Sequence, residues 1–337
     1  MTQTEQKKDL NKIVWSIAND LRGKGQMEPS EYKDYILGIV FYRYLSQKIE
    51  LFLNKTIKED TDYDSITEAC KNEEIQKALK IKANTKIGYW IEPEHFWSEI
   101  VKKTNQPQFN RETLQQALNS FSEYVASLSS SQNKKFDNLF EDIELYSSKL
   151  GQTDAAKKRL IAAIIQKIDG ISTTHDNLEI DALGDIYETF IYYFATIAGK
   201  KAGEFYTPPQ VSELLAKIVT HERKKLKKVY DPTCGSGSLL LQVIKHLSED
   251  DKNIINIYGQ EKVRTTYNLA RMNMILHGIN TDSFDLVNGD TLAHPHKDHL
   301  GEKFQAIVAN PPYSATWEPA LIAPDDERFS VYSKKSS

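Results

Sequence analysis

The segment VYDPTCGSGSLLLQVI, residues 229–244, decides the fold. Val229 and Tyr230 end a short apolar strand, and Gly235-Ser236-Gly237 lets the backbone turn tightly before a helix begins. Apolar residues then recur at helical spacing and share one face, namely Leu240, Val243, Ile244 and Leu247. A strand, a glycine-rich turn and a helix in this order predict one unit of a parallel α/β sheet, with a ligand at the turn.

The alternation of strands and helices continues downstream of this segment. Further strands are predicted at 254–258, 284–287 and 304–308, and a helix between the first two has Val263, Tyr267, Ala270 and Met274 on one face. Alternating units of this kind indicate a Rossmann-like sheet, whose ligands bind beyond the carboxyl ends of the strands.

Upstream of the sheet the chain reads as helical, with few strand signals before residue 170. We therefore predict an all-helical N-terminal domain over residues 1–170 and an α/β domain over 171–337. A helix after Pro208 is expected to be capped by Thr207. Its apolar stripe is expected to be buried and consists of Val211, Leu214, Leu215 and Ile218.

Composition limits the classes of function. The chain has 337 residues, enough for two domains, and a net charge of −4, so it lacks the positive field of an autonomous nucleic-acid binder. Its two cysteines and its polar start, which has no signal-peptide core, favour the cytoplasm. The longest apolar stretch, 35–42, is far too short to span a membrane.

The glycine-rich turn suits a cofactor without phosphate groups. No Gly-Lys-Ser or Gly-Lys-Thr follows it, which argues against nucleotide hydrolysis. Glu261, at the end of the next strand, stands where a ribose diol is held. Together with Glu204 and Asp231 it would favour the positive sulfonium and ammonium groups of S-adenosylmethionine.

Asn310-Pro311-Pro312-Tyr313 is the more specific signal, because it directly follows an apolar strand. The two prolines remove backbone donors and leave carbonyl oxygens directed outward. The side-chain oxygen of Asn310 and the carbonyl of Pro311 could each accept one hydrogen of a planar amino group. Tyr313 would stack on the base, a contact worth roughly 1 to 3 kcal/mol. The two segments together predict methyl transfer to an amino group.

The remaining candidates have simpler interpretations. His294, His296 and His299 do not have the spacing of a structural zinc site, so we interpret them as a solvated loop and expect no metal ion. Cys234 has no histidine or lysine base near it in sequence, so it is expected to pack in the turn rather than to act as a nucleophile.

The chain resembles the modification (HsdM) subunits of type I restriction-modification systems, which methylate adenine on its exocyclic amine. The likeness covers most of the chain. It rests on segments of characteristic sequence, which are 15–22, 203–208, 231–241, 259–261, 268–274, 288–292 and 310–313. The resemblance implies an S-adenosylmethionine-dependent, adenine-specific DNA methyltransferase.

This resemblance also implies roles for individual residues. The segment Gly203, Glu204, Phe205, Tyr206, Thr207 and Pro208 would contact the methionine part of the cofactor. Asp231 with Gly235, Ser236 and Gly237 would wrap it, Glu261 would hold the ribose, and Asp290 the adenine ring. Asn310, Pro311, Pro312 and Tyr313 would hold a target adenine flipped out of double-stranded DNA.

The family assembles two modification subunits with one specificity subunit (HsdS), which reads the DNA, and a restriction subunit (HsdR). Its members continue beyond the motif at 310–313, so a chain that stops at Ser337 is expected to be truncated and to have a sheet that is incomplete after its fourth strand. Two alternatives stay open. In the first, the chain is a non-catalytic subunit that binds only cofactor or partner. In the second, it methylates glutamine amides of proteins.

Overall fold

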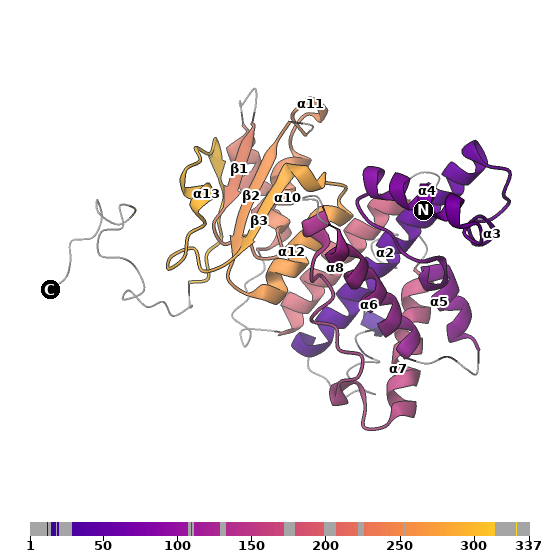
Figure 1. The fold of residues 1–337 in the computed structure, drawn as a ribbon. Helices are drawn as coiled ribbons and strands as arrows, with labels where there is room; N and C mark the ends of the chain where they lie inside the picture. Colours follow the sequence, from indigo (N-terminus) through magenta and orange to yellow (C-terminus); the bar gives the residue numbers. More distant parts are fainter. Residues whose placement is uncertain are drawn as a thin grey trace. The chain divides into compact units, whose positions relative to one another are not determined.

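The computed structural model describes residues 12, 15–17, 19, 29–106, 109, 111–128, 133–171, 179–198, 207–221, 226–252, 254–313 and 328. It divides into two compact units. The first comprises residues 1–202 and 271–282, and the second comprises 203–270 and 283–337 (Figure 1). The predicted boundary at residue 170 stays a prediction, and in the structure the helix that follows it, α8, belongs to the first unit.

The first unit contains helices and no strand among its described residues, as the sequence predicts. Its central helix, α2, is buried along most of its length and packs against α8. Phe41, Tyr42 and Tyr44 of α2 are fully buried and form part of the core of this unit. The described elements are α2 (Pro29–Asp60), α3 (Ile66–Ala69), α4 (Glu73–Lys86), η1 (Pro93–His95), α5 (Trp97–Thr104), α6 (Glu112–Ser127), η2 (Asn133–Phe136), η3 (Ser148–Leu150), α7 (Asp154–Asp169) and α8 (Glu179–Ala198).

The second unit holds a parallel four-stranded sheet in the order β3-β2-β1-β4 among the described residues. The four predicted strands are confirmed, with bounds shifted by a few residues. The strands are β1 (Lys228–Asp231), β2 (Asn256–Glu261), β3 (Phe284–Asn288) and β4 (Ala306–Ile307). The helices are α9 (Pro209–Thr220), α10 (Ser238–Lys245), α11 (Glu249–Lys252) and α13 (Lys297–Leu300), and α12 (Arg264–Leu276) is divided between the two units after Ala270.

The two faces of the sheet differ in chemistry. Val229, Ile257 and Phe284 are paired across β1, β2 and β3 and form a fully buried apolar row. The next row, on the opposite face, is Tyr230, Tyr258 and Asp285. The ring of Phe304 stacks on Tyr230 at 4.6 Å, and it lies 5.2 Å from Tyr258. Aromatic and polar side chains therefore cover this second face.

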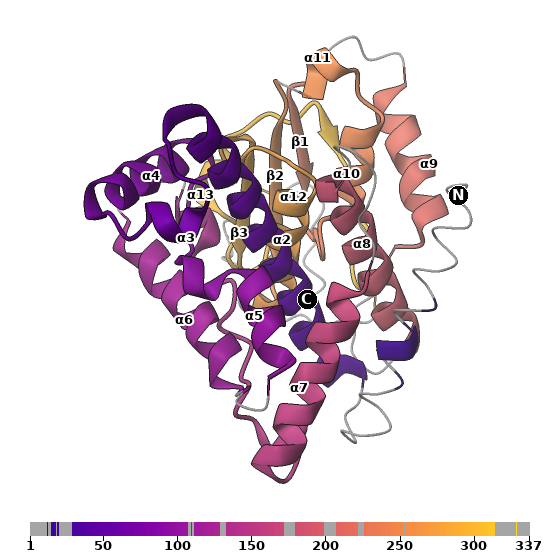
Figure 2. The ribbon, with the colours of Figure 1, turned by 90° about the vertical axis from the view of Figure 1, so that its right-hand side faces the viewer.

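Helix α9 differs from the sequence prediction. Val211, Leu214 and Ile218 are 45%, 58% and 60% exposed, whereas Ser212 and Ala216 are buried. The helix packs against α10, beside which it lies in Figure 2. Small residues allow two helices to approach closely, and this contact uses the small-residue face. The expectation of a buried apolar stripe was therefore wrong.

None of the described helices combines the length and the hydropathy that crossing a bilayer requires.

Gly259→Ala is expected to lower the free energy of unfolding by about 1 to 3 kcal/mol. A Cβ atom at this strand position would lie 2.7 Å from Leu286 Cδ2 and 3.1 Å from Cys234 Sγ. In a site without such contacts, alanine in place of glycine usually stabilises a protein by about 0.4 to 1 kcal/mol. Urea denaturation measures the difference.

Gly301→Ala is the matched control, because its added Cβ would meet nothing closer than 3.9 Å. This variant should stay within about 0.5 kcal/mol of the parent. A Gly259→Ala protein as stable as the control would contradict the close packing of β2 against the turn.

Candidate functional site

The glycine-rich turn after β1 is held in a conformation that needs glycine. Gly235 and Gly237 have φ values of 55° and 77°, in the left-handed region. Gly237 caps the N-terminus of α10, and the Cys234 amide donates to the carbonyl oxygen of Gln260 at 3.0 Å. A Cβ built on Gly235 would meet no atom within 4 Å. The turn therefore leaves open space beside its backbone, where a ligand can lie against the main chain.

Asp231 ends β1 and is 2% exposed. Its Oδ1 accepts a hydrogen bond from the Thr233 amide at 2.9 Å. The pKa of Asp231 is raised from 3.8 to about 7, mainly by burial and in addition by the negative charge of Glu261, against the hydrogen bonds from Thr233, which lower it. A cationic ligand beside this carboxyl group would favour its ionised form.

Glu261 ends β2 and joins the turn to the sheet. Its Oε2 accepts from the Gly235 amide at 3.0 Å and its Oε1 from the Val263 amide at 2.8 Å. The Glu261 carbonyl oxygen accepts from Asn288 Nδ2 at 2.8 Å and from the Gly289 amide at 2.9 Å. Glu261 thus connects the carboxyl ends of β1, β2 and β3 through hydrogen bonds.

Asp290 follows β3, and its side chain stabilises the turn that it begins. Its Oδ1 accepts from the amides of Leu292 and Ala293 at 3.0 and 3.2 Å, and its Oδ2 pairs with Lys262 Nζ at 2.9 Å. The hydrogen bond from Lys262 lowers the pKa of Asp290, so this group is ionised at neutral pH.

Asn310 lies just beyond β4, and its amide is fixed by a residue 103 positions earlier. Its Nδ2 donates to Thr207 Oγ1 at 3.0 Å. The same hydroxyl was expected to cap α9, and that expectation was wrong: Pro208 is the N-cap residue, and no side chain caps the helix. The amide nitrogen is used by Thr207, so the amide oxygen is directed elsewhere and can accept a hydrogen bond from a ligand.

The other predicted site residues are distributed as follows. Pro208, Pro311 and Pro312 are exposed, and the Tyr313 side chain is 85% exposed. Ser236 Oγ lies 3.0 Å from Ser238 Oγ at the start of α10. Gly203, Glu204, Phe205 and Tyr206 lie outside the described residues.

Cys234 is buried in the turn. Burial raises the pKa of its thiol well above the usual value, with Asp231 and Glu261 adding to the effect. A thiol that stays protonated is a poor nucleophile, which agrees with the packing role expected from the sequence.

Sequence reasoning gave no individual role to three residues that shape this site, namely Lys262, Asn288 and Gly259, although the last two lie in the characteristic segments 288–292 and 259–261. Gly259 had a detectable signal, because a glycine inside a strand often marks close approach of another segment. Lys262 directly follows an acid at a strand end, but its partner Asp290 is 28 positions away. Nothing local in the sequence indicates that contact.

Two family models match the chain. The HsdM N-terminal domain matches residues 10–168, and the N-6 DNA Methylase domain matches residues 178–337. The described site residues all fall within the second match, and the helical elements α2 to α6, with α7 up to residue 168, fall within the first.

Characterised relatives and solved structures agree with these matches. The chain is 35% identical to the Type I restriction enzyme MpnII methylase subunit of Mycoplasma pneumoniae, over 94% of this chain and 60% of that protein. It is 27% identical to the MjaIX methylase subunit of Methanocaldococcus jannaschii, over 96% and 54%. A crystal structure of the type I restriction-modification methyltransferase subunit from Streptococcus thermophilus matches with a TM-score of 0.81 and 36% identity, over 92% and 64%. The chain thus spans about 60% of the length of these relatives.

Asp231→Asn is expected to change how stability depends on pH. The folded-state pKa of about 7 exceeds the ordinary value of 3.8, so the folded chain binds this proton more tightly than the unfolded chain. The free energy of unfolding therefore falls as pH rises between these values. Asparagine keeps an acceptor for the Thr233 amide but cannot ionise. At pH 8 the variant should be more stable than the parent, on the order of 1 to 4 kcal/mol.

Urea denaturation at pH 5 and pH 8 measures this effect. Asp298→Asn, at an exposed position on α13, is the control and should follow the parent at both pH values. Equal pH dependence in the Asp231→Asn variant and the parent would contradict the raised pKa of Asp231.

Proposed function

Because this chain belongs to the family of type I methylase subunits, with an HsdM N-terminal domain and an N-6 DNA methylase domain, we propose that it methylates the exocyclic amine of adenine in DNA. The observation that supports this most directly is the Asn310 amide, fixed by Thr207 with its oxygen available, one strand away from the turn at Asp231. An acceptor for an amino group and a cofactor turn are what methyl transfer to nitrogen requires.

The proposed cofactor is S-adenosylmethionine, which supplies the methyl group when bound. Its sulfonium and ammonium groups suit the coupled acids Asp231 and Glu261, because a positive charge offsets the cost of ionising a buried carboxyl group. The open side of Gly235 gives the ligand a close approach to the backbone. In this proposal Glu261 holds the ribose and Asp290 the adenine ring, with 203–208 along the methionine part.

The proposed acceptor site consists of Asn310 to Tyr313. Asn310 Oδ1 and the Pro311 carbonyl oxygen accept the two hydrogens of the target amine, which draws the nitrogen lone pair out of conjugation with the ring. Tyr313 is exposed and free to stack on a base flipped out of the duplex. Alignment of the amine with the donor then provides most of the rate enhancement.

The partners follow from the same family. We propose that sequence is read by a separate specificity subunit, that two copies of this chain join it on double-stranded DNA, and that a restriction subunit completes the system. The net charge of −4 fits this division, because the chain alone offers no strong general attraction to the phosphate backbone.

Two other functions make different predictions. A methyltransferase for protein glutamine would modify an amide nitrogen and be indifferent to DNA. A subunit that only binds would take up cofactor and transfer nothing. Transfer of a labelled methyl group, tested with DNA and with protein substrates in the presence of the specificity subunit, separates all three.

Asn310→Ala is expected to abolish methyl transfer while keeping cofactor binding. Removing a hydrogen-bond acceptor that acts on the reacting amine should cost about 100-fold or more in turnover. Calorimetric titration of S-adenosylmethionine into the purified chain should give the same affinity in the parent and in Asn310→Ala.

Asp231→Ala provides the opposite control, since it should lose saturable cofactor binding. Loss of binding in both variants would mean that Asn310 supports the cofactor site rather than the target base. Binding unaffected by Asp231→Ala would falsify the proposed cofactor turn.

Thr207→Val is expected to lower turnover by about 10-fold, because valine keeps the shape of threonine but removes the hydroxyl that accepts from Asn310. Thr207→Ser keeps a hydroxyl and should restore most of the rate. A positioning role predicts that kcat falls in Thr207→Val and recovers in Thr207→Ser, because only the serine variant keeps the hydroxyl that accepts from Asn310. A Thr207→Ser variant as impaired as Thr207→Val would show that the methyl group, and not the hydroxyl, matters here.

A further inference from the structure

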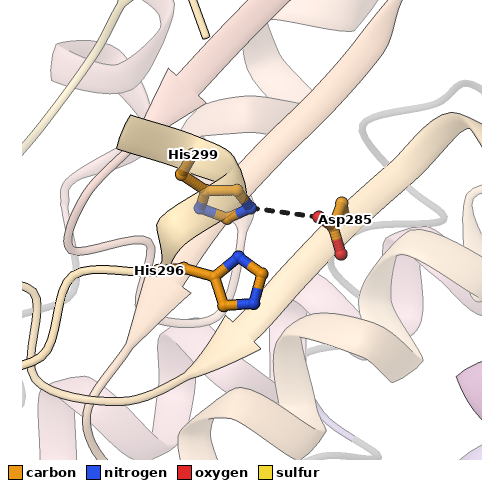
Figure 3. A group of neighbouring side chains, drawn as sticks. All are labelled: Asp285, His296 and His299. Atoms are coloured by element: carbon orange, nitrogen blue, oxygen red, sulfur yellow. Dashed lines mark hydrogen bonds and ion pairs between the residues drawn. The ribbon is translucent and has the colours of Figure 1, made fainter. Parts of the chain in front are cut away.

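Three side chains lie close together on the face of the sheet that carries Tyr230 and Tyr258. Asp285 lies on β3, His296 is the N-cap residue of α13, and His299 lies within α13. One ligand atom from each lies within 4.8 Å of the other two (Figure 3). His299 is 4% exposed, and its Nε2 lies 3.1 Å from Asp285 Oδ2. The sequence interpretation of these histidines as a solvated loop was therefore wrong for His299.

The His299 ring is held in place by its neighbours. It makes edge-to-face contacts with Tyr230 and Tyr258, with ring centroids 5.5 and 5.4 Å apart. These tyrosines occupy the same cross-strand row as Asp285. The carboxylate and the ring therefore have little freedom to move apart.

The backbone of His296 is fixed independently, through the buried side chain of Gln260. Gln260 Oε1 accepts from the His296 amide at 3.2 Å, and Gln260 Nε2 donates to the His294 carbonyl oxygen at 2.9 Å. The side chain of Gln260 thus holds the backbone of the loop 294–296 by two hydrogen bonds. The His296 ring then lies 4.9 Å from the ring of His299, centroid to centroid.

Two nitrogens in the cluster, Nδ1 of His296 and Nδ1 of His299, are buried without a hydrogen-bond partner among the described residues. Figure 3 shows His296 Nδ1 on the side of the ring that faces His299. A buried polar atom without a partner is costly, and most such atoms in folded proteins are satisfied. A cation between the three side chains would satisfy His296 Nδ1.

We propose that Asp285, His296 and His299 bind one divalent transition-metal ion of the zinc class. Two imidazole nitrogens and one carboxylate oxygen are a donor set that suits Zn²⁺ and Co²⁺, whereas Mg²⁺ and Ca²⁺ prefer oxygen ligands throughout. The ion is held by His296 Nδ1, His299 Nε2 and an oxygen of Asp285. The Asp285 side chain is 43% exposed, which leaves access for water as a fourth ligand.

The ligand exchange is balanced in protons. Without metal, His299 Nε2 carries the hydrogen that it shares with Asp285. When the ion binds, this nitrogen gives its lone pair to the metal and its proton passes to the solvent, while Nδ1 takes up one proton from the solvent, so the ring stays neutral.

The role of such an ion is structural and does not depend on the proposed methyl transfer. Asp285 precedes the segment 289–296, and the histidines stand at and just after its end. An ion bridging them would close this segment at both ends. Asp290 lies within it, so metal binding would steady the loop that carries this residue.

Co²⁺ titration of the purified, metal-stripped chain tests the proposal. One Co²⁺ per chain should bind saturably and give the strong visible absorption of a four-coordinate ion with nitrogen ligands. Zn²⁺ should displace it and raise the melting temperature, as any ligand specific for the folded state does. His296→Ala and Asp285→Asn should each weaken Co²⁺ binding by at least 10-fold.

His294→Ala is the matched control, because His294 is exposed, lies on the same loop and accepts the hydrogen bond from Gln260 with its backbone carbonyl oxygen, which alanine keeps. It should bind Co²⁺ like the parent. Circular dichroism establishes that each variant is folded. Absence of saturable binding by the parent would overturn the proposal, as would equal binding by the folded His296→Ala variant and the parent.

Discussion

The hydrogen bond from the Gly235 amide to the Glu261 carboxylate, 3.0 Å long, is the interaction on which the proposed site depends. It fixes a left-handed glycine turn against the end of β2, and the Cys234 amide adds a second bond to the backbone of Gln260. Both hydrogen bonds require glycine at position 259, because any side chain there would collide with Cys234 and Leu286. With the turn held in this way, the space beside Gly235 is open.

The burial of Asp231 lowers the stability of the ligand-free chain at neutral pH and favours the binding of a cation. Asp231 is buried with Glu261 close enough to raise its pKa, and the described residues supply it with hydrogen bonds from Thr233. A carboxyl group in such surroundings resists ionisation until a positive charge arrives. A cationic ligand would therefore gain affinity from the same burial that disfavours the ionised, ligand-free chain at neutral pH.

The sequence predicts the order of strands and helices in the second unit well, because periodicity and glycine turns are local signals. It fails where the outcome depends on distant residues. The helical spacing of Val211, Leu214 and Ile218 shows that they share a face, but not which face packs against α10. Thr207 has the local signature of a helix cap, yet its hydroxyl is taken by Asn310, far along the chain. His299 looks solvated in a polar loop, and only the sheet shows the tyrosines that bury it.

The sheet also explains how the two halves of the proposed site come into register. Tyr230 of β1 pairs with Ile307 of β4, and the Val308 amide donates to the Tyr230 carbonyl oxygen at 3.0 Å. Asp231 and Asn310 therefore leave adjacent strands, which lie about 4.8 Å apart, at the same end of the sheet. A shift of β4 by one residue would turn Asn310 to the other face. Backbone pairing thus brings Asp231 and Asn310 to the same end of the sheet, and the hydrogen bond with Thr207 sets the orientation of the Asn310 amide.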